Sequence, residues 1–449
     1  MTRYESWGRY KEFSKFSHRI QSLDWTSDKL YVNGANKPLL PYGLGRSYGD
    51  SCLNDGGILV DITGLNRFLS FDIQSGVLRC EAGVTLQEIN ELIVLQGWFL
   101  SVTPGTQYVT IGGAIANDIH GKNHATGGAF GCYVRRFELL RSNGERLICS
   151  PTENGDWFRA TIGGLGLTGI ILWAELQLKR IRSPFFDVES IQFRNLDEFF
   201  EIAIESDEAG YEYTVAWLDC LAKGKSLGRG VFQRGNNASP PFERTMRIPK
   251  SRTINVPFDA PNFAINFLAM RAFNLVWYHK QLRRVQRKII YYVPFFYPLD
   301  MIGHWNRAFG KRGFFQYQFV IPYNDDYAAI RHILHKISNA NLLPTLNVFK
   351  TFGDLPSPGL LSFPRKGVTL AIDFPNQGQR TLDFLNELDE LVRTNGGVVY
   401  PAKDARMSAE NFQAFYPQWQ EFARYVDPML SSSFWRRVTG PVGKTPQAV

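Results

Sequence analysis

Apolar runs of strand length, separated by glycine-rich turns, dominate residues 1–184. "GGILVDIT" and "GVLRCEAG" have the composition and flanking turn residues of strands. The stretch "TLQEINELIVLQG" follows them, and its Thr85 and Glu88 form the sequence signature of a capping box at a helix start. "FELLRSNGERLICS" predicts a β-hairpin, because Asn143-Gly144 supplies the turn that needs positive φ.

Beyond residue 184 the pattern changes to alternating strands and helices with less glycine. "LDEFFEIAIES", "DYAAIRHILHKISNA" and "TLDFLNELDELVRTNGG" have apolar residues at helical spacing, whereas "LPTLNVFKTFG" and "GVTLAIDFP" are typical of strands. The chain of 449 residues is long enough for two domains, each with its own core. We therefore expect an α+β fold with domains at 1–184 and 185–395 and a segment at 396–449 that returns to the first domain.

Two stretches of the second domain are expected to be mobile loops. The polar, proline-containing "RGNNASPPFERTMRIPKSRT" predicts one near 234–253. The other, near 260–300, mixes apolar and aromatic residues with the basic run "HKQLRRVQRK". Its composition suits either an interfacial segment that contacts lipid or a buried helix with a solvated basic end.

Composition narrows the classes of partner. The net charge of +8 and the pI near 9.1 favour an anionic partner. Lys and Arg are spread along the chain and no nucleic-acid-binding motif accompanies them, so we expect no nucleic-acid partner. The five cysteines are odd in number and lack CxxC spacing, which argues against a disulfide framework and a metal site and for a reducing compartment.

The chain shows no targeting or membrane-spanning pattern. The first twenty residues alternate charged and aromatic residues and have no apolar core, unlike a secretory signal peptide. The longest uncharged run, 92–117, contains Pro104, four glycines and many polar residues, unlike a membrane helix. We expect a cytoplasmic protein.

Three runs of glycine in the first domain would let the backbone approach a ligand closely, as pyrophosphate binding requires. They comprise Gly43, Gly45 and Gly49; Gly105, Gly112 and Gly113; and Gly163, Gly164, Gly166 and Gly169. One such run is usually only a turn, but three separated by strands favour a dinucleotide site. The first run does not open an amphipathic helix, which argues against a Rossmann site for NAD, and no P-loop motif is present.

These stretches carry a resemblance. "PYGLGRSYGDSCLN", "VTPGTQYVTIGGAIANDIHGKNH" and "GGLGLTGIIL" resemble the FAD-binding domain of the vanillyl-alcohol-oxidase and p-cresol-methylhydroxylase (PCMH) superfamily. "GRSYGD", "DIHGKNH", "WNRAFG", "FFQYQFVIP", "AIDFP" and "AKDAR" are more specifically similar to the decaprenylphosphoryl-ribose oxidase family, the flavin-dependent half of a 2'-epimerase. The resemblance implies a PCMH-type FAD-binding domain joined to a second α+β substrate domain built on an antiparallel sheet.

The resemblance also implies the cofactor site. The residues that it places around FAD are Gly43, Leu44, Gly45, Arg46, Ser47, Tyr48, Gly49, Gly105, Thr110, Ile111, Gly112, Gly113, Asn117, His120, Ile171 and Tyr400. The first run would wrap the pyrophosphate, with a hydroxyl donated by Ser47. Many relatives have a flavin-linking histidine where this chain has Arg46, so FAD should be held non-covalently.

The same resemblance selects three catalytic residues, Lys403, His120 and Gln318, and the substrate-binding residues Tyr48, Lys122, Tyr297, Gln318 and Thr369. Lys403 would stabilise negative charge on the reduced flavin or contact the reacting hydroxyl; the alternative is an exposed lysine paired with Asp404. His120 and Lys122 are two apart, and so are Gln316 and Gln318, which places each pair on one face of an extended segment.

Two further expectations concern neighbours of these residues. His124 is interpreted as structural. Some relatives have a cysteine at the position of Ala371, so an inhibitor that bonds to that thiol should fail here.

The implied activity is FAD-dependent oxidation of a secondary alcohol to a ketone, at C2 of a polyprenylphosphoryl-ribose. A quinone or other acceptor would reoxidise the flavin, and a partner short-chain reductase would complete the epimerisation. Peripheral contact with the inner membrane would suit this lipid-linked substrate. The alternatives are a soluble aldonolactone or alditol oxidase of the same superfamily, and a non-catalytic protein that binds anionic lipid.

Overall fold

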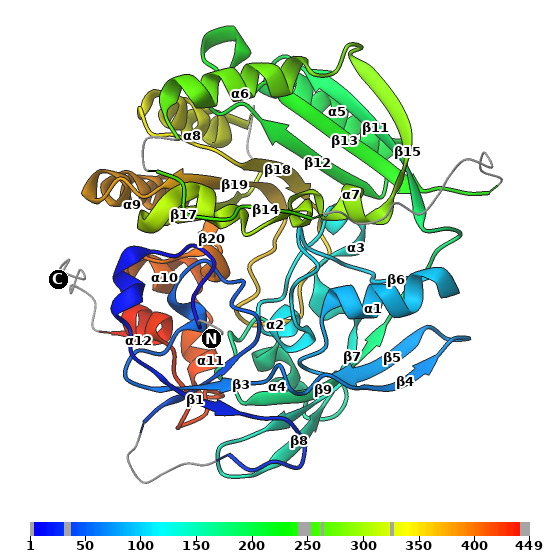
Figure 1. The fold of residues 1–449 in the computed structure, drawn as a ribbon, viewed down its shortest axis with the longest axis vertical. Coiled ribbons are helices and arrows are strands. Elements are labelled where there is room, and N and C mark those ends of the chain that lie inside the picture. The colour runs from blue at the N-terminus through cyan, green and yellow to red at the C-terminus, as the bar shows by residue number, and fades with distance from the viewer. Residues whose placement is uncertain (1–3, 31–36, 241–252, 262–264, 324–326, 441–449) are drawn as a thin grey trace.

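The computed structural model describes residues 4–30, 37–240, 253–261, 265–323 and 327–440. Two layers of sheet and helix stand one above the other in Figure 1, the lower built mainly from the first half of the chain and the upper mainly from the second. Within the described ranges, no helix has the length and apolar content needed to cross a bilayer.

The lower half contains two main sheets (Figure 1). A parallel sheet has the order β1 (Arg19–Ser22), β3 (Ile58–Asp61), β2 (Leu39–Tyr42). An antiparallel sheet has the order β4 (Phe68–Asp72), β5 (Val77–Glu81), β9 (Ile170–Gln177), β7 (Val134–Leu140), β8 (Arg146–Cys149). The remaining elements are α1 (Leu86–Ile93), α2 (Ile111–Ala116), α3 (His124–Gly127), α4 (Gly155–Thr161) and the paired short strands β6 (Trp98–Phe99) and β10 (Lys179–Arg180).

Two local predictions for this half are confirmed. The capping box forms at the start of α1, where the Thr85 hydroxyl accepts from the Glu88 amide and the Glu88 carboxylate accepts from the Thr85 amide. β7 and β8 form the expected hairpin, and Gly144 has a φ of 87° at its turn.

The upper half is built on an eight-stranded antiparallel sheet. Its strand order is β15 (Val285–Tyr291), β11 (Phe185–Phe193), β13 (Gly230–Asn237), β12 (Tyr213–Leu218), β18 (Asn347–Phe352), β19 (Gly367–Pro375), β17 (Phe314–Ile321), β20 (Val398–Val399). The other elements are α5 (Leu196–Glu208), α6 (Phe267–His279), α7 (Tyr292–Phe296), α8 (Ala328–Asn339), α9 (Gln379–Thr394) and the paired strands β14 (Ile254–Asn255) and β16 (Ile302–Gly303).

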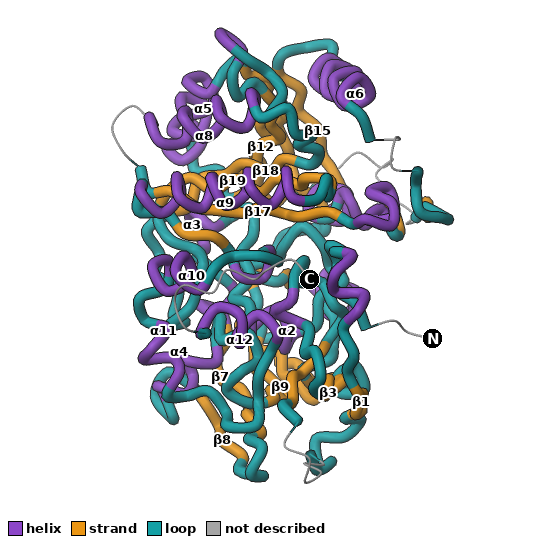
Figure 2. The backbone as a smooth tube through the Cα atoms, turned by 90° about the vertical axis from the view of Figure 1, so that its left-hand side faces the viewer, coloured by secondary structure: helices purple, strands orange, loops and turns teal. Residues whose placement is uncertain are grey.

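The two faces of this sheet differ. Phe319, Phe349 and Leu370 project from one face and form a core with apolar residues of α5, α8 and α9. Figure 2 shows α5 and α8 on this side of the strands and α6 on the other. The opposite face of β17 carries Gln316 and Gln318, as the alternation along "FFQYQFVIP" predicts.

The prediction of mobile loops near 234–253 and 260–300 is wrong in part. Residues 234–237 continue β13, because their backbone groups pair with β11 and Arg234 forms ion pairs with Glu189 and Glu205. The remainder of that segment from 241 to 252 lies outside the described residues. Within 260–300 the chain forms α6, β15 and α7, so most of this stretch is regular structure.

The last described segment joins the two halves. After β20 it forms α10 (Ala409–Phe415), α11 (Trp419–Ala423) and α12 (Ser433–Thr439), beside the N-terminal strands (Figure 1). The Leu39 amide donates to the Met429 carbonyl at 2.7 Å, and the Ser431 amide donates to the Leu39 carbonyl at 2.9 Å. The segment therefore follows a strand of the upper sheet with helices that pack on the lower half.

Candidate active site

The three glycine runs meet around α2. A methyl group on Gly43 would lie 2.5 Å from the Thr110 hydroxyl, so the first run touches the start of this helix. The amides of Gly163 and Leu165 donate to the carbonyls of Ile115 and Ala116 at 2.9 and 2.8 Å. The third run therefore packs against the other end of α2, so the three runs lie together in the fold. That they surround one pyrophosphate stays a prediction.

We expected glycine in the first run so that a ligand could approach the backbone, but the structure gives a different reason for these glycines. A methyl group on Gly45 would overlap the Tyr42 hydroxyl, and one on Gly49 would overlap the Asp404 carbonyl. At both glycines the position of a side chain is therefore filled by other protein atoms. A phosphate would have to approach their backbone amides instead. At Gly105, in contrast, no atom of the described residues lies within 4 Å of such a methyl group.

The residues present fit FAD. Each run leaves some backbone accessible, since Gly105 is exposed and Gly43, Gly113 and Gly166 are half-buried, and we call this region the cradle. The Tyr400 hydroxyl donates to the Asn117 carbonyl at 2.7 Å and ties the cradle to the upper half. The other predicted contacts lie within or beside it: Leu44, Arg46, Ser47 and Tyr48 in the first run, Thr110 to Gly113 at the start of α2, and Ile171 in β9. Which of them touch FAD stays a prediction.

Arg46 lies at the edge of this cradle. Its guanidinium carbon is 4.6 Å from the centroid of the Trp7 ring, and Nη1 donates to the Leu44 carbonyl at 2.6 Å. A guanidinium held in this way has no nucleophilic atom for a bond to the flavin.

A polar wall on the upper sheet faces the cradle. In register on β17 and β19, Gln316 pairs with Asp373 and Gln318 with Ala371. Gln316 Nε2 donates to Asp373 Oδ1 at 2.6 Å, and Gln318 Nε2 donates to the Thr369 hydroxyl at 3.3 Å. Tyr317 points the other way and donates to Asp389 on α9, which confirms the predicted alternation.

His120 links the lower half to this wall. Its Nε2 lies 2.9 Å from Gln318 Nε2 and its Nδ1 lies 3.1 Å from Lys350 Nζ. An imidazolium would present an N–H to each of these nitrogens, which are themselves donors, so the geometry favours the neutral ring. Burial and the charge of Lys350 lower the pKa of His120 well below its usual value, in agreement with this geometry.

Lys403 lies between the first glycine run and the wall. It ends a short helical turn after β20, and its Nζ is 4.0 Å from the centroid of the Tyr48 ring. Burial lowers the pKa of Lys403 to about 8, against the opposing effect of the negative charge of Asp373. Asp404, its sequence neighbour, instead pairs with Arg437, so the reading of Lys403 as an exposed partner of Asp404 is wrong.

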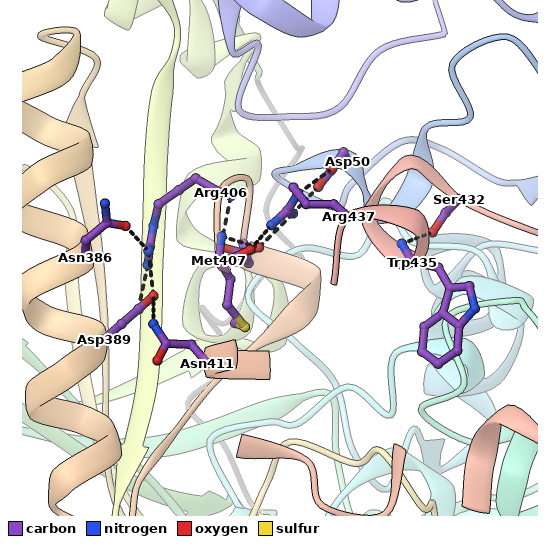
Figure 3. A network of polar contacts seen from close by, with 10 residues as sticks. Asp50, Asn386, Asp389, Arg406, Met407, Asn411, Ser432, Trp435 and Arg437 are labelled. Carbon is purple, nitrogen blue, oxygen red and sulfur yellow. Dashed lines mark hydrogen bonds and ion pairs between the residues drawn. The ribbon is translucent and has the colours of Figure 1, made fainter. Parts of the chain in front are cut away.

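A buried network holds the Lys403 segment in place (Figure 3). Arg437 Nη2 contacts Asp50 Oδ1 at 2.6 Å and Asp404 Oδ2 at 2.9 Å, which ties α12 to the first glycine run and to the residue after Lys403. Arg406 forms an ion pair with Asp389 of α9 at 2.5 Å. The position of Lys403 therefore depends on contacts from both halves of the molecule.

Lys122 and Tyr297 lie on a neighbouring side of the site. Lys122 follows His120 in a turn before α3 and not in an extended strand. Both residues lie near the site, but not because an extended segment places their side chains on one face, as predicted. Its Nζ donates to the Phe295 carbonyl at 2.5 Å, and its pKa is lowered to about 7 by burial and by the charge of Lys350.

Tyr297 is fully buried, and its hydroxyl is shared between Asn90 of α1 at 2.9 Å and Thr103 at 2.5 Å. The structure therefore brings no surface of its ring to a substrate. His124 is also buried, with its ring 4.1 Å from that of Phe352, which fits the structural interpretation.

Two residues that the sequence patterns did not single out belong to the wall. Lys350 is 8% exposed, donates to the Gly121 carbonyl at 3.0 Å, and has its pKa lowered to about 7 by burial and by Lys403. Asp373 is 0% exposed, and its Oδ2 has no hydrogen-bond partner among the described residues. A charged residue within an apolar strand, as in "NVFKTF" and "LAIDFP", was the available signal for both.

Comparisons with known proteins agree with this geometry. Residues 30–150 match the family model of an FAD binding domain. The chain is 38% identical over 408 residues to decaprenylphosphoryl-beta-D-ribose oxidase of Mycolicibacterium smegmatis, which covers 88% of each chain. It is 30% identical over 373 residues to an uncharacterised Streptomyces coelicolor protein, which covers 79% of this chain and 100% of that one.

A shorter match covers about a third of the chain. It is 32% identical over 164 residues to L-gulonolactone oxidase of Scyliorhinus torazame, 36% of either chain. The match to the Mycolicibacterium smegmatis protein, in contrast, takes in most of the chain. This chain is therefore an FAD-dependent oxidoreductase that belongs to the decaprenylphosphoryl-ribose oxidase family, with a PCMH-type FAD-binding domain.

Proposed function

We propose that this protein oxidises the C2 hydroxyl of a polyprenylphosphoryl-ribose to a ketone, as the first step of epimerisation to the arabinose form. One observation supports a phosphorylated substrate in particular. Lys350 Nζ donates to the carbonyl of Gly121, the residue before Lys122, at 3.0 Å, and burial together with repulsion from the charge of Lys403 lowers the pKa of Lys350. A phosphodiester would relieve this repulsion, which a neutral lactone or polyol would not.

The side chains have separate parts in this reaction. Bound FAD would accept the hydride that leaves the carbinol carbon, and the hydroxyl would lose its proton to water as the ketone forms. The Lys403 ammonium stabilises the negative charge that accompanies this transfer. Gln318, held in place by neutral His120, orients the sugar hydroxyl, and Lys122 and Lys350 bind the phosphate.

We further infer three partners from the family. A quinone or another acceptor takes the two electrons from the reduced enzyme. A short-chain reductase then reduces the keto sugar to the hydroxyl of inverted configuration. The enzyme works in the cytoplasm in peripheral contact with the inner membrane, because its substrate is attached to a lipid.

Anaerobic mixing of the purified yellow protein with detergent-dispersed polyprenylphosphoryl-ribose tests the proposal. We expect loss of the oxidised-flavin absorbance with this substrate and none with an aldonolactone or alditol. The reverse result would assign the chain to the soluble sugar oxidases, and a colourless protein that takes up no FAD would contradict both. The Lys403→Ala variant should still bind FAD and be yellow, but its flavin should not be bleached by the substrate. The control Lys366→Ala, at an exposed lysine paired with Asp354, should bind FAD and be bleached like the parent.

A further inference from the structure

α6 presents apolar side chains to the outside and a polar one to the protein. Its side chains are exposed or half-buried except for Asn274, whose amide donates to Asp219 at 2.7 Å. A helix on the surface of a soluble protein normally has the opposite arrangement. Figure 2 shows α6 at the surface, on the side of the sheet opposite α5 and α8.

The outward side of α6 carries exposed apolar side chains. Leu268, Leu275 and Val276 are 80%, 52% and 68% exposed, and their spacing of seven and eight residues aligns them on one side of the helix. Leu282, just after the helix, is 95% exposed. We call these four residues the α6 surface. Apolar side chains gathered in this way mark a site of contact with a partner or a membrane.

The surroundings of the α6 surface are basic. The sequence has no Asp or Glu between Asp259 and Asp300, but it has Arg271, Lys280, Arg283 and Lys288, together with Arg284 and Arg287, which pair with Glu198 and Asp187. Burial and the charge of Lys288 lower the pKa of Lys280. The flanking acids are engaged elsewhere: Asp259 with Arg9, and Asp300 with the Gln107 amide.

The α6 surface lies on the same side of the sheet as the polar wall. The Trp277 ring of α6 is 6.5 Å from that of Trp217 on β12. Trp217 is in register with Val348 of β18, and Val348 with Ala371 of β19, beside Gln318. Val348 is 40% exposed, so an apolar path runs along this face from α6 toward the wall.

We propose that the α6 surface docks on a bilayer that contains anionic lipid, with its apolar side chains among the acyl chains and Arg271, Lys280, Arg283 and Lys288 against the headgroup phosphates. A second copy of the chain fits less well, because a two-fold contact would set the same cations against each other. The inference rests on the proposed function in that a lipid-linked sugar resides in such a bilayer.

Flotation of the purified FAD-bound protein with vesicles tests this surface without any substrate. We expect binding to phosphatidylcholine vesicles containing 30% phosphatidylglycerol (about this fraction suffices for a negative surface potential) and much weaker binding to pure phosphatidylcholine. The triple variant Leu268→Ser, Val276→Ser, Leu282→Ser should reduce the bound fraction about 10-fold or more. The matched control Leu95→Ser, Ile204→Ser, at residues 69% and 51% exposed elsewhere, should bind like the parent.

Three results would overturn the proposal: a parent protein that stays unbound with anionic vesicles, a triple variant that binds as well as the parent, or a dimer in sedimentation that the triple substitution dissociates. Flavin bleaching by detergent-dispersed substrate separates the two proposals. Bleaching without vesicle binding contradicts the docking surface alone, and vesicle binding without bleaching contradicts the proposed function alone.

Discussion

The side-chain amide of Gln318 lies 2.9 Å from Nε2 of His120, which is 198 residues earlier in the chain. This contact joins the polar wall to the loop that follows α2. Because Lys350 occupies the other ring nitrogen, the imidazole is held from both sides in one orientation.

Removing the side-chain amide of Gln318 should therefore slow flavin reduction without weakening FAD binding. For Gln318→Ala we expect the rate of flavin reduction to fall about 10-fold or more, because the reacting hydroxyl loses its alignment. The FAD content, read from the visible spectrum, should stay that of the parent. Gln233→Ala, at a half-buried glutamine of β13, is the control. An unchanged rate in Gln318→Ala would exclude an orienting role.

The rate should depend on pH through Lys403. Burial lowers its pKa to about 8, so the side chain is a cation below that pH and neutral above it. If the cation is the active form, flavin reduction slows as pH rises through about 8. Lys403→Arg stays charged over this range and should lose the alkaline decline, although its overall rate will be lower. Stopped-flow rates between pH 6 and 10 (a range chosen to bracket the lysine on both sides) check this, and a parent profile that is flat there would contradict it.

Asp373 should set the position of that decline. The negative charge of Asp373 raises the pKa of Lys403. Burial raises the pKa of Asp373 itself to about 7, although Gln316 and Lys403 have weaker effects in the opposite direction. The substitution Asp373→Asn removes the charge, so the alkaline midpoint should move to lower pH by about one unit. Asp354→Asn, at an exposed carboxylate paired with Lys366, should leave the midpoint in place. A midpoint that stays fixed in Asp373→Asn would show that the two groups titrate independently.

The ion pairs of Arg437 should increase the free energy of unfolding. Arg437→Ala leaves the carboxylates of Asp50 and Asp404 buried without their partner, and we expect unfolding to become easier by about 3–5 kcal/mol. Urea unfolding followed by tryptophan fluorescence measures this change. Arg331→Ala breaks only an exposed pair with Asp197 and should have little effect. Equal stabilities of the two variants would show that the network in Figure 3 contributes nothing to folding.

Ala371 predicts resistance to inhibitors that act through a cysteine thiol. It lies beside Gln318 on the polar wall and is half-buried. An inhibitor that bonds to the thiol found here in some relatives should leave the parent enzyme active. Ala371→Cys should restore covalent labelling, observed as a mass increase of the intact protein. Labelling of the parent at another position would show that a different nucleophile is accessible.

The sequence by itself determined the features that depend on neighbouring residues. The capping box of α1, the turn at Gly144 and the opposite directions of Tyr317 and Gln318 follow from local dihedral angles and from the period of a strand. The glycine runs were recognisable for the same reason, since a positive φ or a close approach excludes a side chain locally.

Only the tertiary structure decided which charged side chains are buried together. Lys350 and Asp373 stand out in the sequence only as charged residues within apolar strands. They belong to the site because β18, β19 and β17 are neighbours and because the loop after α2 packs on Lys350. Likewise, Asn274 faces inward and Leu268 outward because Asp219 accepts from the Asn274 amide. Burial and pairing depend on residues far apart in the chain, and local periodicity carries no information about them.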